Sequence, residues 1–451
     1  MSAPAHADIT APPAPVSFGQ ALRFWFKLGF VSFGGPAGQI ALMHTELVER
    51  RRWISEQRFL HALNYCMVLP GPEAQQLATY IGWLMHKTRG GLVAGGLFVL
   101  PSLFMLIALS WLYVAWGDLP VVAGIFYGIK PAVAAIVVQA AHRIGSRALK
   151  NKGLWAIAAA SFVAIFAGDV PFPVIVIGAA VIGYTWGRWR PDDFKVGAGH
   201  SASQPGHGPA LIDDDTPTPA HARFSWSGLS RVLGMGALLW ALPMAGLTTM
   251  LGWSHTLTQM GWFFTKAALL TFGGAYAVLP YVYQGAVSHY GWVTPTQMMD
   301  GLALGETTPG PLIMVVAFVG FLGGYVKALF GPESLFLAGA VAATLVTWFT
   351  FLPSFVFILA GGPLVESTHR VLRLTAPLTA ITAAVVGVIL NLALFFGYHV
   401  LWPQGWAGSV DGAALAIALS AAVALLHYKR SVMQVIAGCG LVGLAFTLAR
   451  G

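Results

Sequence analysis

Long apolar segments dominate the chain and limit the folds open to it. Stretches long enough to cross a hydrocarbon layer of about 30 Å occur near residues 92–116, 120–142, 229–253, 334–360 and 371–398, with shorter pairs at 153–168 and 172–187 and at 412–428 and 431–449. Only 9% of the residues are charged, whereas a soluble protein has about 25%. A soluble enzyme, a disordered chain and a disulfide-stabilised secreted domain are therefore excluded. The sequence predicts an all-α polytopic membrane protein.

The basic residues do not form a nucleic-acid-binding surface. The formal net charge is +8, but Lys and Arg are scattered among apolar segments, without a basic stripe or an aromatic reading motif. In a membrane protein such an excess mainly marks the loops that face the cytoplasm. Cys66 and Cys439 both lie in apolar runs, which argues against a disulfide scaffold. We therefore expect no nucleic-acid partner and no stabilising disulfide.

One polar segment, residues 188–228, divides the chain near its middle. It is rich in Asp, His and Pro, and this composition offers nothing to bury. Residues 1–17 lack the basic and apolar regions of a signal peptide, so we predict a disordered tail there. The predicted organisation is this tail, a first membrane repeat at 18–187, a linker at 188–228, and a second membrane repeat with an extra leading helix at 229–451.

The two halves of the chain are related by an internal repeat. An offset of 239 residues places Lys27 on Lys266 and Trp53 on Trp292. The same offset aligns two tripeptides, Phe-Gly-Gly at 33–35 with 272–274 and Pro-Gly-Pro at 70–72 with 309–311. Chance in a glycine-rich chain would hardly supply both triplets in one register. The chain is therefore predicted to be a duplicated unit, as in many transporters.

Charge predicts how the two copies lie in the membrane. The first copy has basic residues on both sides of its Pro-Gly-Pro motif, at Arg50, Arg51, Arg52, Arg58, Lys87 and Arg89. In the second copy the segment that matches the first of these positions, 288–291, has no Lys or Arg, and only Lys327 lies near the second position. Further cytoplasmic loops are predicted at Arg143, Arg147, Lys150 and Lys152, at His369, Arg370 and Arg373, and at Lys429 and Arg430. By the positive-inside tendency the repeats are antiparallel, and the linker is cytoplasmic.

The glycine and proline motifs predict sharp reversals of the chain. About 34 mostly apolar residues separate Arg52 from Lys87, and both residues favour the cytoplasmic side. Two legs of about 15 residues would each be about 22 Å long, which suits a re-entrant hairpin with its tip at 70–72. The same argument places another tip at 32–36, because proline ends a helix and glycine permits positive φ. Two spanning helices, each with a break, are the alternative.

The motifs also resemble a known family. The most specific stretches read FVSFGGPAGQIALMHTELVERRRWIS, LPGPEAQQLATYIGW, LTFGGAYAVLPYVYQGAVSHYGWVT and TTPGPLIMVVAFVGF. Over nearly its whole length the chain is similar to the long, two-domain form of the chromate ion transporter (CHR) family. The resemblance implies export of chromate, a dianion shaped like sulfate, across the bacterial inner membrane, with chromate resistance as the result; some relatives are linked to sulfate. Ala275 departs from the family pattern, which often has a third glycine there.

The hairpin tips are the predicted substrate site. A helix that begins after a tip presents free N–H groups and the positive end of its dipole, which suits an anion. Antiparallel repeats would bring tips from both sides together near mid-membrane. The predicted cradle is Gly34, Gly35, Pro36, Gly71, Pro72, Gly273, Gly274, Gly310 and Pro311. The alternative is that these are only turn and helix-packing positions.

Single charges inside apolar segments are further candidates. Lys27 and Lys266 lie two turns before the Phe-Gly-Gly tips and would attract the dianion, unless their side chains extend to the membrane surface. Glu73 and Glu306 flank the Pro-Gly-Pro tips and are predicted to couple proton and anion movement. For Glu73 the alternative is stabilisation of a first helical turn, and for Glu306 it is pairing with a basic group. Six polar side chains could hydrogen bond an oxyanion, or alternatively make polar contacts between helices: Asn64, Gln75, Gln76, Thr79, Thr307 and Thr308.

No pattern in the sequence indicates an enzyme or a bound cofactor. The chain has no His-Glu-x-x-His, Gly-x-Ser-x-Gly, Cys-x-x-Cys or P-loop motif, and the linker histidines lack metal-ligand spacing. The predicted function is secondary active export of chromate coupled to the proton gradient, in contact with the lipid bilayer. A passive oxyanion channel or a sulfate transporter is the alternative, and a homodimer is left open.

Overall fold

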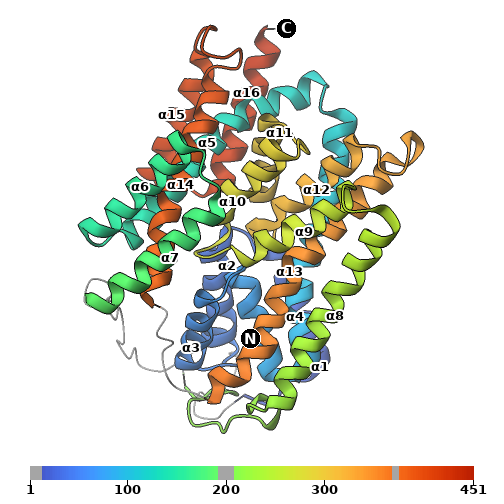
Figure 1. Cartoon of the computed structure of the whole chain (residues 1–451), viewed down its shortest axis with the longest axis vertical. Helices are drawn as coiled ribbons and strands as arrows, with labels where there is room; N and C mark the ends of the chain where they lie inside the picture. Colours follow the sequence, from blue (N-terminus) through green and yellow to red (C-terminus); the bar gives the residue numbers. More distant parts are fainter. Residues whose placement is uncertain (1–12, 191–207, 368–374, 451) are drawn as a thin grey trace, which may run out of the picture.

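The computed structural model describes residues 13–190, 208–367 and 375–450 of the chain. Within these residues the fold is built of helices (Figure 1), six of which are long and apolar enough to cross a membrane. The predicted all-α polytopic fold is therefore confirmed. Most of the predicted tail, the first part of the linker and the predicted anchors at 369–373 lie outside the described residues.

The first half of the chain forms seven α-helices and one π-helical turn in the described residues. They are α1 (Phe18–Val31), α2 (Gly35–His44), the π-turn η1 (Thr45–Arg50), α3 (Glu56–Val68), α4 (Glu73–Trp116), α5 (Pro120–Ala148), α6 (Lys152–Gly168) and α7 (Phe172–Trp189). The linker contributes the short helix η3 (Ala220–Ala222), and α8 (Trp226–Leu251) follows it.

The second half repeats this order. It contains α9 (Thr256–Leu269), α10 (Ala275–Tyr283), the π-turn η4 (Gln284–His289), α11 (Pro295–Thr307), η5 (Leu312–Met314), α12 (Val315–Val326), η6 (Pro332–Ser334), α13 (Leu335–Ser367), α14 (Thr375–Leu401), α15 (Gly412–Leu426) and α16 (Val432–Arg450). The helix α8 has no counterpart in the first half, as the sequence predicted for the leading helix.

The repeat extends to fine details of the backbone. The π-turns η1 and η4 begin and end at positions that are 239 residues apart, and so do α3 and α11. Because π-helical turns are rare, sharing one at the same place indicates a common backbone plan. The caps match as well: Ser55 and Thr294 each accept a hydrogen bond from the backbone N–H three residues later, from Arg58 and Gln297 respectively, which fixes where each helix begins.

Small residues allow the long helices to pack in pairs. The helix α4 doubles back at His86 and Lys87, where φ and ψ are not helical. Its two arms then approach so closely that a Cβ on Gly82 would lie 2.5 Å from the Gly90 carbonyl oxygen. In the second copy Gly320 and Gly324 bring α12 equally close to α13. Such glycine contacts are typical of membrane helix pairs.

The two copies are interlocked rather than side by side. The helix α5 of the first copy packs against α14, α15 and α16, and α14 packs against α5, α6 and α7. Figure 1 shows α3 and α11 near opposite ends of the molecule, with α2 and α10 between them. Because helices of each copy pack against helices of the other, both copies are needed to form a single core. The orientation of the copies in the membrane stays a prediction.

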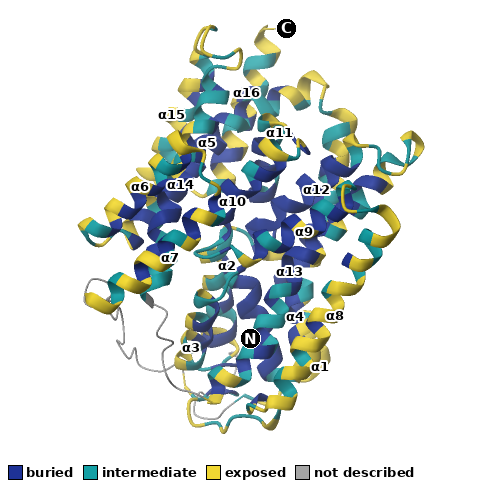
Figure 2. Cartoon of the chain, viewed as in Figure 1, coloured by how far each residue is buried: buried dark blue, intermediate teal, exposed yellow. Residues whose placement is uncertain are grey.

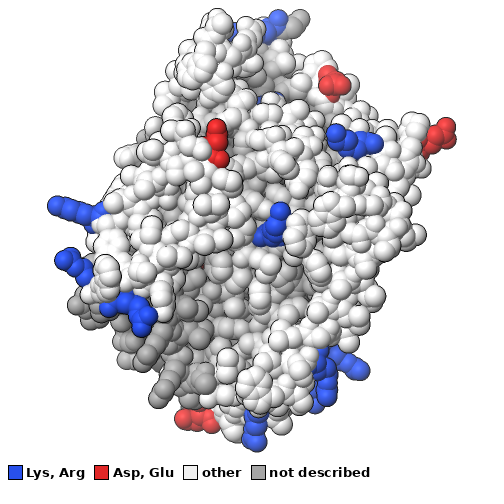
Figure 3. All heavy atoms as spheres, viewed as in Figure 1, with Lys and Arg blue, Asp and Glu red and all other residues white. Residues whose placement is uncertain are grey.

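The outer surface is apolar. Figure 2 shows buried residues concentrated on the central helices and exposed residues on outer helices such as α8. Large apolar side chains are exposed there and elsewhere, among them Leu242 at 62% and Phe104 at 66%. Charged side chains are few on the face drawn in Figure 3. Exposed apolar surface on this scale is costly in water and suits lipid contact.

Part of the linker prediction is wrong. Residues 208–225 dock onto the first copy: Ile212 forms an isolated β-bridge with Ile54, and the Ser55 hydroxyl donates to Asp214 at 2.5 Å. Ala222 is fully buried. Single apolar residues between the polar ones, such as Ile212 and Ala222, are buried. The average composition of the segment does not show them.

The predicted loop at residues 143–152 also begins too early. Arg143 and Arg147 belong to α5, which continues to Ala148. The apolar run ends before the helix does, because the last turns of a helix can carry charged side chains; Arg143 is half-buried there and Arg147 is exposed.

A buried ion pair ties α3 to the end of α13. The Arg58 guanidinium donates to Glu366 at 2.6 Å, and the Tyr80 hydroxyl donates to the same carboxylate at 2.5 Å. The Glu366 side chain is only 1% exposed. Arg58 also donates to the backbone carbonyl of Thr216 in the docked linker at 2.8 Å, so one side chain joins both copies and the linker.

We expect Arg58→Met to destabilise the protein strongly, because it leaves the Glu366 carboxylate buried without its cation. The cost of breaking such a pair is about 3–5 kcal/mol, measured as a lower melting temperature of the detergent-purified protein. Arg50→Met is the matched control: its pair with Glu46 has an arginine side chain that is 69% exposed, so the expected change is within about 1 kcal/mol. Equal melting temperatures for the two variants would contradict the role of the pair.

Candidate substrate site at the crossing tips

The helices break at the four predicted tips. The backbone takes positive φ at Gly34 (89°), Gly71 (127°), Gly273 (81°) and Gly310 (101°). Residues with a side chain rarely adopt such angles, which is why glycine occupies these positions. We call the four segments tip A1 (32–36), tip B1 (70–72), tip A2 (271–275) and tip B2 (309–311).

Ring contacts across the legs show that the chain reverses at the A tips. Phe24 of α1 packs edge-on against Trp53, with ring centroids 4.9 Å apart, although tip A1 lies between them in the sequence. In the second copy Phe263 and Trp292 repeat this contact at 5.6 Å. At tip B1 the legs α3 and α4 pack together in the same way. The folding back is a feature of the structure, while its relation to a membrane stays a prediction.

Each B tip is hydrogen bonded to the A tip of the other copy. The backbone N–H of Gly71 donates to the Thr271 carbonyl oxygen at 2.8 Å, and that of Gly310 donates to the Ser32 carbonyl oxygen at 2.9 Å. These two bonds are equivalent under the 239-residue offset. Every tip thus belongs to a pair that crosses between the two copies.

The crossing leaves no room for larger residues at the B tips. A Cβ on Gly71 would lie 2.4 Å from the Ser354 hydroxyl of α13, and a Cβ on Gly310 would lie 2.9 Å from the Ser102 Cβ of α4. Ser102 and Ser354 follow Leu-Pro in matching sequences of the two copies. Like the hydrogen bonds, these contacts join the B tip of each copy to a residue of the other copy.

Helices begin directly after the tips. The helices α2, α4 and α10 start at Gly35, Glu73 and Ala275, and η5 starts at Leu312 ahead of α12. Their first N–H groups have no partner within the helix, and the helix dipoles are positive at these ends. The structure thus brings together the nine predicted cradle residues as two crossing pairs of tips.

Amide side chains of the first copy fill the space around the crossing. The Gln39 side chain donates to the carbonyl oxygens of Ser32 and Gly310, and Gln76 donates to the Pro70 carbonyl oxygen at 2.8 Å. Within the described residues the Oε1 atoms of Gln39, Gln75 and Gln76 are buried without a hydrogen-bond partner. Buried polar atoms of this kind mark places where water or a ligand binds. Sequence reasoning found Gln75 and Gln76 but missed Gln39.

The predicted carboxylates lie at the crossing too. Glu306 is 6% exposed and accepts a hydrogen bond from the hydroxyl of Tyr276, which follows tip A2. The Arg143 guanidinium lies over the Tyr276 ring, with its carbon 5.9 Å from the ring centre. Glu73 is partly buried in the first turn of α4, and Arg147 is the charged group whose field reaches it. The sequence placed both arginines in a loop and so missed them.

The lysines are placed less favourably for substrate contact. Lys27 is exposed on the outer face of α1, and the Lys266 ammonium lies 5.7 Å from the ring centre of Trp262, which is itself 36% exposed. Both placements favour the alternative in which these side chains extend toward the membrane surface.

A second polar cluster was not predicted. Asp300 of α11 is 2% exposed, accepts a hydrogen bond from the Tyr113 hydroxyl at 2.8 Å and lies 3.7 Å from the Lys130 ammonium. It ties α11 to the end of α4, as Arg58 ties α3 to the end of α13. A single charge in an apolar run is the signal that could have identified Asp300.

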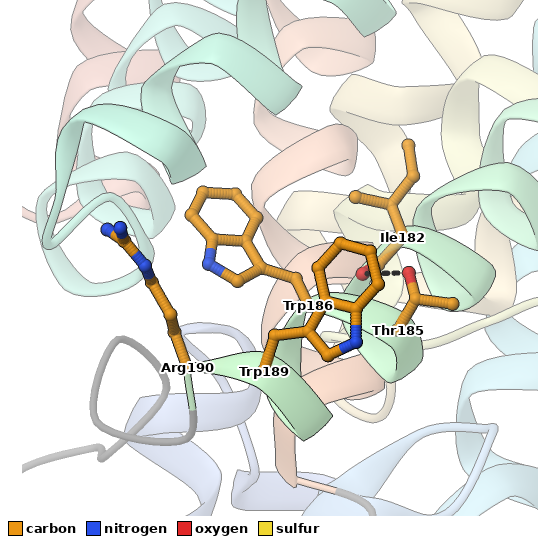
Figure 4. Close-up of a pocket in the computed structure, with 5 residues that line it drawn as sticks. All are labelled: Ile182, Thr185, Trp186, Trp189 and Arg190. Carbon is orange, nitrogen blue, oxygen red and sulfur yellow. Dashed lines mark hydrogen bonds between the residues drawn. The ribbon is translucent and has the colours of Figure 1, made fainter.

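Features away from the crossing do not suggest a cofactor. Among residues 13–190, 208–367 and 375–450 no group of three His, Cys, Asp or Glu side chains could hold a metal ion. A cavity of about 310 Å³ lies at the end of α7 between Trp186, Trp189 and Arg190 (Figure 4). Aromatic and basic residues together at a helix end suit the membrane–water interface, and none of them belongs to a tip.

We expect Gly310→Ala to disturb the crossing, because the new Cβ meets Ser102 and the backbone needs a φ that alanine disfavours. The expected cost is about 1–3 kcal/mol, measured as a lower melting temperature in detergent, with transport reduced in parallel. Gly96→Ala, in α4, is the control: its new Cβ meets no atom within 4 Å, so this variant should not have a lower melting temperature. If both variants melt alike, the B tip is not a constrained position.

Comparison with known proteins agrees with this architecture. The family model described as "Chromate transporter" matches residues 19–184 and 258–444, one region in each copy. The chain is 29% identical to a "Chromate transport protein" of Cupriavidus metallidurans over 98% of both chains. It is 35% identical to a "Chromate transport protein" of Pseudomonas aeruginosa over 85% of this chain and 82% of that one.

A third relative, a "Probable chromate transport protein" of Synechococcus elongatus, is 27% identical over 84% of this chain and 85% of its own length. No solved structure matches the chain. The family match covers most of the sequence and both copies of the repeat, and the three relatives align over 82%, 85% and 98% of their own lengths. The chain therefore belongs to the chromate transporter family, whose members are multi-pass membrane transport proteins and not enzymes.

Proposed function

We propose that this protein exports chromate across the bacterial inner membrane, that the crossing tips bind the dianion, and that a proton moves with it. The relatives named as chromate transport proteins support chromate as the substrate. The linker would then be cytoplasmic, and chromate resistance would follow from export. Sulfate has the same charge and shape, so it is the competing substrate of the same site.

The reciprocal hydrogen bonds at Gly71 and Gly310 are the observation that carries this proposal. They hold the broken helices of each copy against those of the other inside the bundle, so helix N-termini from both copies present the positive ends of their dipoles there. At the A tips, in contrast, a Cβ on Gly35 or Gly274 would meet no atom within 4 Å, so an oxyanion can approach the backbone closely there. N–H groups and helix dipoles that share in compensating a dianion hold it less tightly than a cluster of cations would, which favours its release.

The membrane potential favours export of a dianion. Each elementary charge moved across 100 mV is worth about 2.3 kcal/mol, and a negative interior repels the anion outward. A proton that accompanies the dianion leaves one net negative charge to move outward. The potential therefore still drives export when one proton is carried.

Glu73 and Glu306 are the proposed proton-coupling groups. An ionised carboxylate beside the tips repels the dianion, whereas the protonated acid does not. Proton binding and anion binding then favour each other, so both move in the same direction. Glu306 is the stronger candidate because its side chain is buried and hydrogen bonded to Tyr276.

The first test is chromate uptake into proteoliposomes that contain the purified protein. We expect uptake to rise when the external side is made acidic and when a potassium–valinomycin gradient makes the lumen positive. Sulfate added outside should compete. A flux that ignores the pH gradient but follows the potential would indicate a passive oxyanion channel, and the absence of chromate flux would refute the proposed substrate.

A second test replaces the carboxylates one at a time. Glu306→Gln should permit chromate flux that no longer depends on the pH gradient, because the amide cannot release a proton. Glu73→Gln in the same assay shows whether Glu73 contributes to the coupling. Glu49→Gln, an exposed carboxylate hydrogen bonded to His44, is the control and should keep the pH dependence of the unmodified protein. Proton coupling that survives in both tip variants would contradict the assignment.

A further inference from the structure

Arg143 is a cation beside the crossing tips, and it has no direct ion-pair partner among the described residues. Its guanidinium lies over the Tyr276 ring, and within the described residues no hydrogen bond or ion pair to the guanidinium is recorded. The side chain is half-buried on α5, a helix that packs against the central helices of both copies. A charge in such surroundings is costly unless something compensates it.

The nearest carboxylate has a different partner. Tyr276 stands between the two charged groups: its ring contacts Arg143, and its hydroxyl donates to Glu306. The carboxylate therefore compensates the guanidinium through the field across one ring rather than by a direct ion pair. An oxyanion that enters beside Tyr276 would meet five unused N–H donors of the guanidinium.

We propose that Arg143 is the cation that binds the transported dianion at the crossing tips, and that the Glu306 carboxylate and the dianion compete for its positive charge. The inference rests on the proposed function, whose site it completes. Arginine stays charged at all accessible pH values, so the proton that changes the charge balance is carried by Glu306. The bound dianion replaces the carboxylate as the counter-ion, and one proton accompanies it.

The other charged groups nearby have different roles. Arg147, one turn further along α5, acts on Glu73 of α4, and Cys66 of α3 is the other titratable group facing Glu73. Lys130 and Asp300 compensate each other, and the stretch of α5 from Lys130 to Arg143 spans about 20 Å. Arg143 is thus the cation that faces Tyr276 and Glu306 from the elements around them.

The two copies differ at this point. The helix α14 occupies the place of α5 in the second copy, and no Lys or Arg lies in its part of the chain, residues 375–401. The repeat therefore supplies a symmetric backbone at the tips, and α5 supplies one cation on one side. A single asymmetric charge suits a site that holds one dianion at a time.

The experiment measures initial rates of chromate uptake into proteoliposomes for Arg143→Gln and Arg143→Lys. Loss of a charged hydrogen-bond donor should raise KM for chromate about ten- to a hundredfold in Arg143→Gln. Arg143→Lys keeps the charge but loses the planar fork, so we expect a smaller rise. Arg188→Gln is the matched control. Arg188 also lies over a tyrosine ring, with its guanidinium carbon 5.5 Å from the centre of the Tyr184 ring, but it lies at the end of α7. The KM of this variant for chromate should equal that of the unmodified protein.

The coupling is tested with the double variant Arg143→Gln/Glu306→Gln. If the carboxylate acts by competing for Arg143, Glu306→Gln should lower KM at neutral pH in the unmodified background and have little effect in the Arg143→Gln background. Independent effects of the two changes would overturn the competition. Melting temperatures in detergent identify variants that fail to fold, and Arg143→Lys then replaces Arg143→Gln with the same direction of change expected.

The outcomes separate this inference from the proposed function. If the unmodified protein transports chromate and Arg143→Gln has an unchanged KM and pH profile, Arg143 does not bind the substrate, although the transporter assignment stands. If the unmodified protein transports no chromate, the proposed function itself fails. If Arg143→Gln loses maximal rate but keeps KM and pH dependence, its role is structural, and the inference is overturned.

Discussion

The structure depends on the crossing of the tips, where each copy hydrogen bonds to the other. In the apolar interior a broken helix leaves N–H and carbonyl groups that water cannot satisfy, so a break survives only where another chain segment provides partners. Gly71 and Gly310 find theirs on Thr271 and Ser32. The breaks of one copy are thus stable only in the presence of the other copy, and the interlocked packing of α5 and α14 follows from the same exchange.

Two polar clusters occupy corresponding positions in the two copies. Each one anchors the helix that precedes a B tip, α3 in the first copy and α11 in the second. Arg58 and Glu366 tie α3 to α13, and Asp300 with Lys130 and Tyr113 ties α11 to α4. The residues differ between the clusters, but the helices correspond. A duplicated backbone can therefore keep its contacts while each copy acquires its own charges. The side-chain amides near the crossing, including Gln39, and the cation Arg143 all belong to the first copy. The polar groups around the crossing tips are therefore asymmetric although the backbone is repeated.

Much of this fold could be predicted because its signals are local. The apolar runs gave most of the long helices, and the Phe-Gly-Gly and Pro-Gly-Pro motifs gave the four tips, since glycine with positive φ and proline act on their own neighbours. The errors came from averages over a segment. The docked linker around Ile212 was hidden by polar neighbours, and the charges of Arg143 and Arg147 suggested a loop although both lie within α5.

The sequence by itself determined the membrane-spanning class of the protein, its duplication and the places where its helices break, because these depend on hydropathy, periodicity and backbone freedom. Only the tertiary structure decided which tip meets which, that Arg143 rather than Lys27 or Lys266 contacts the tyrosine that binds Glu306, and that the buried Asp300 pairs with Lys130. These facts depend on which helix faces are turned inward, and that is fixed by packing among segments far apart in the chain. A single charge in an apolar run indicates a buried polar contact or a functional site, but the residue that contacts it can be identified only in the folded protein.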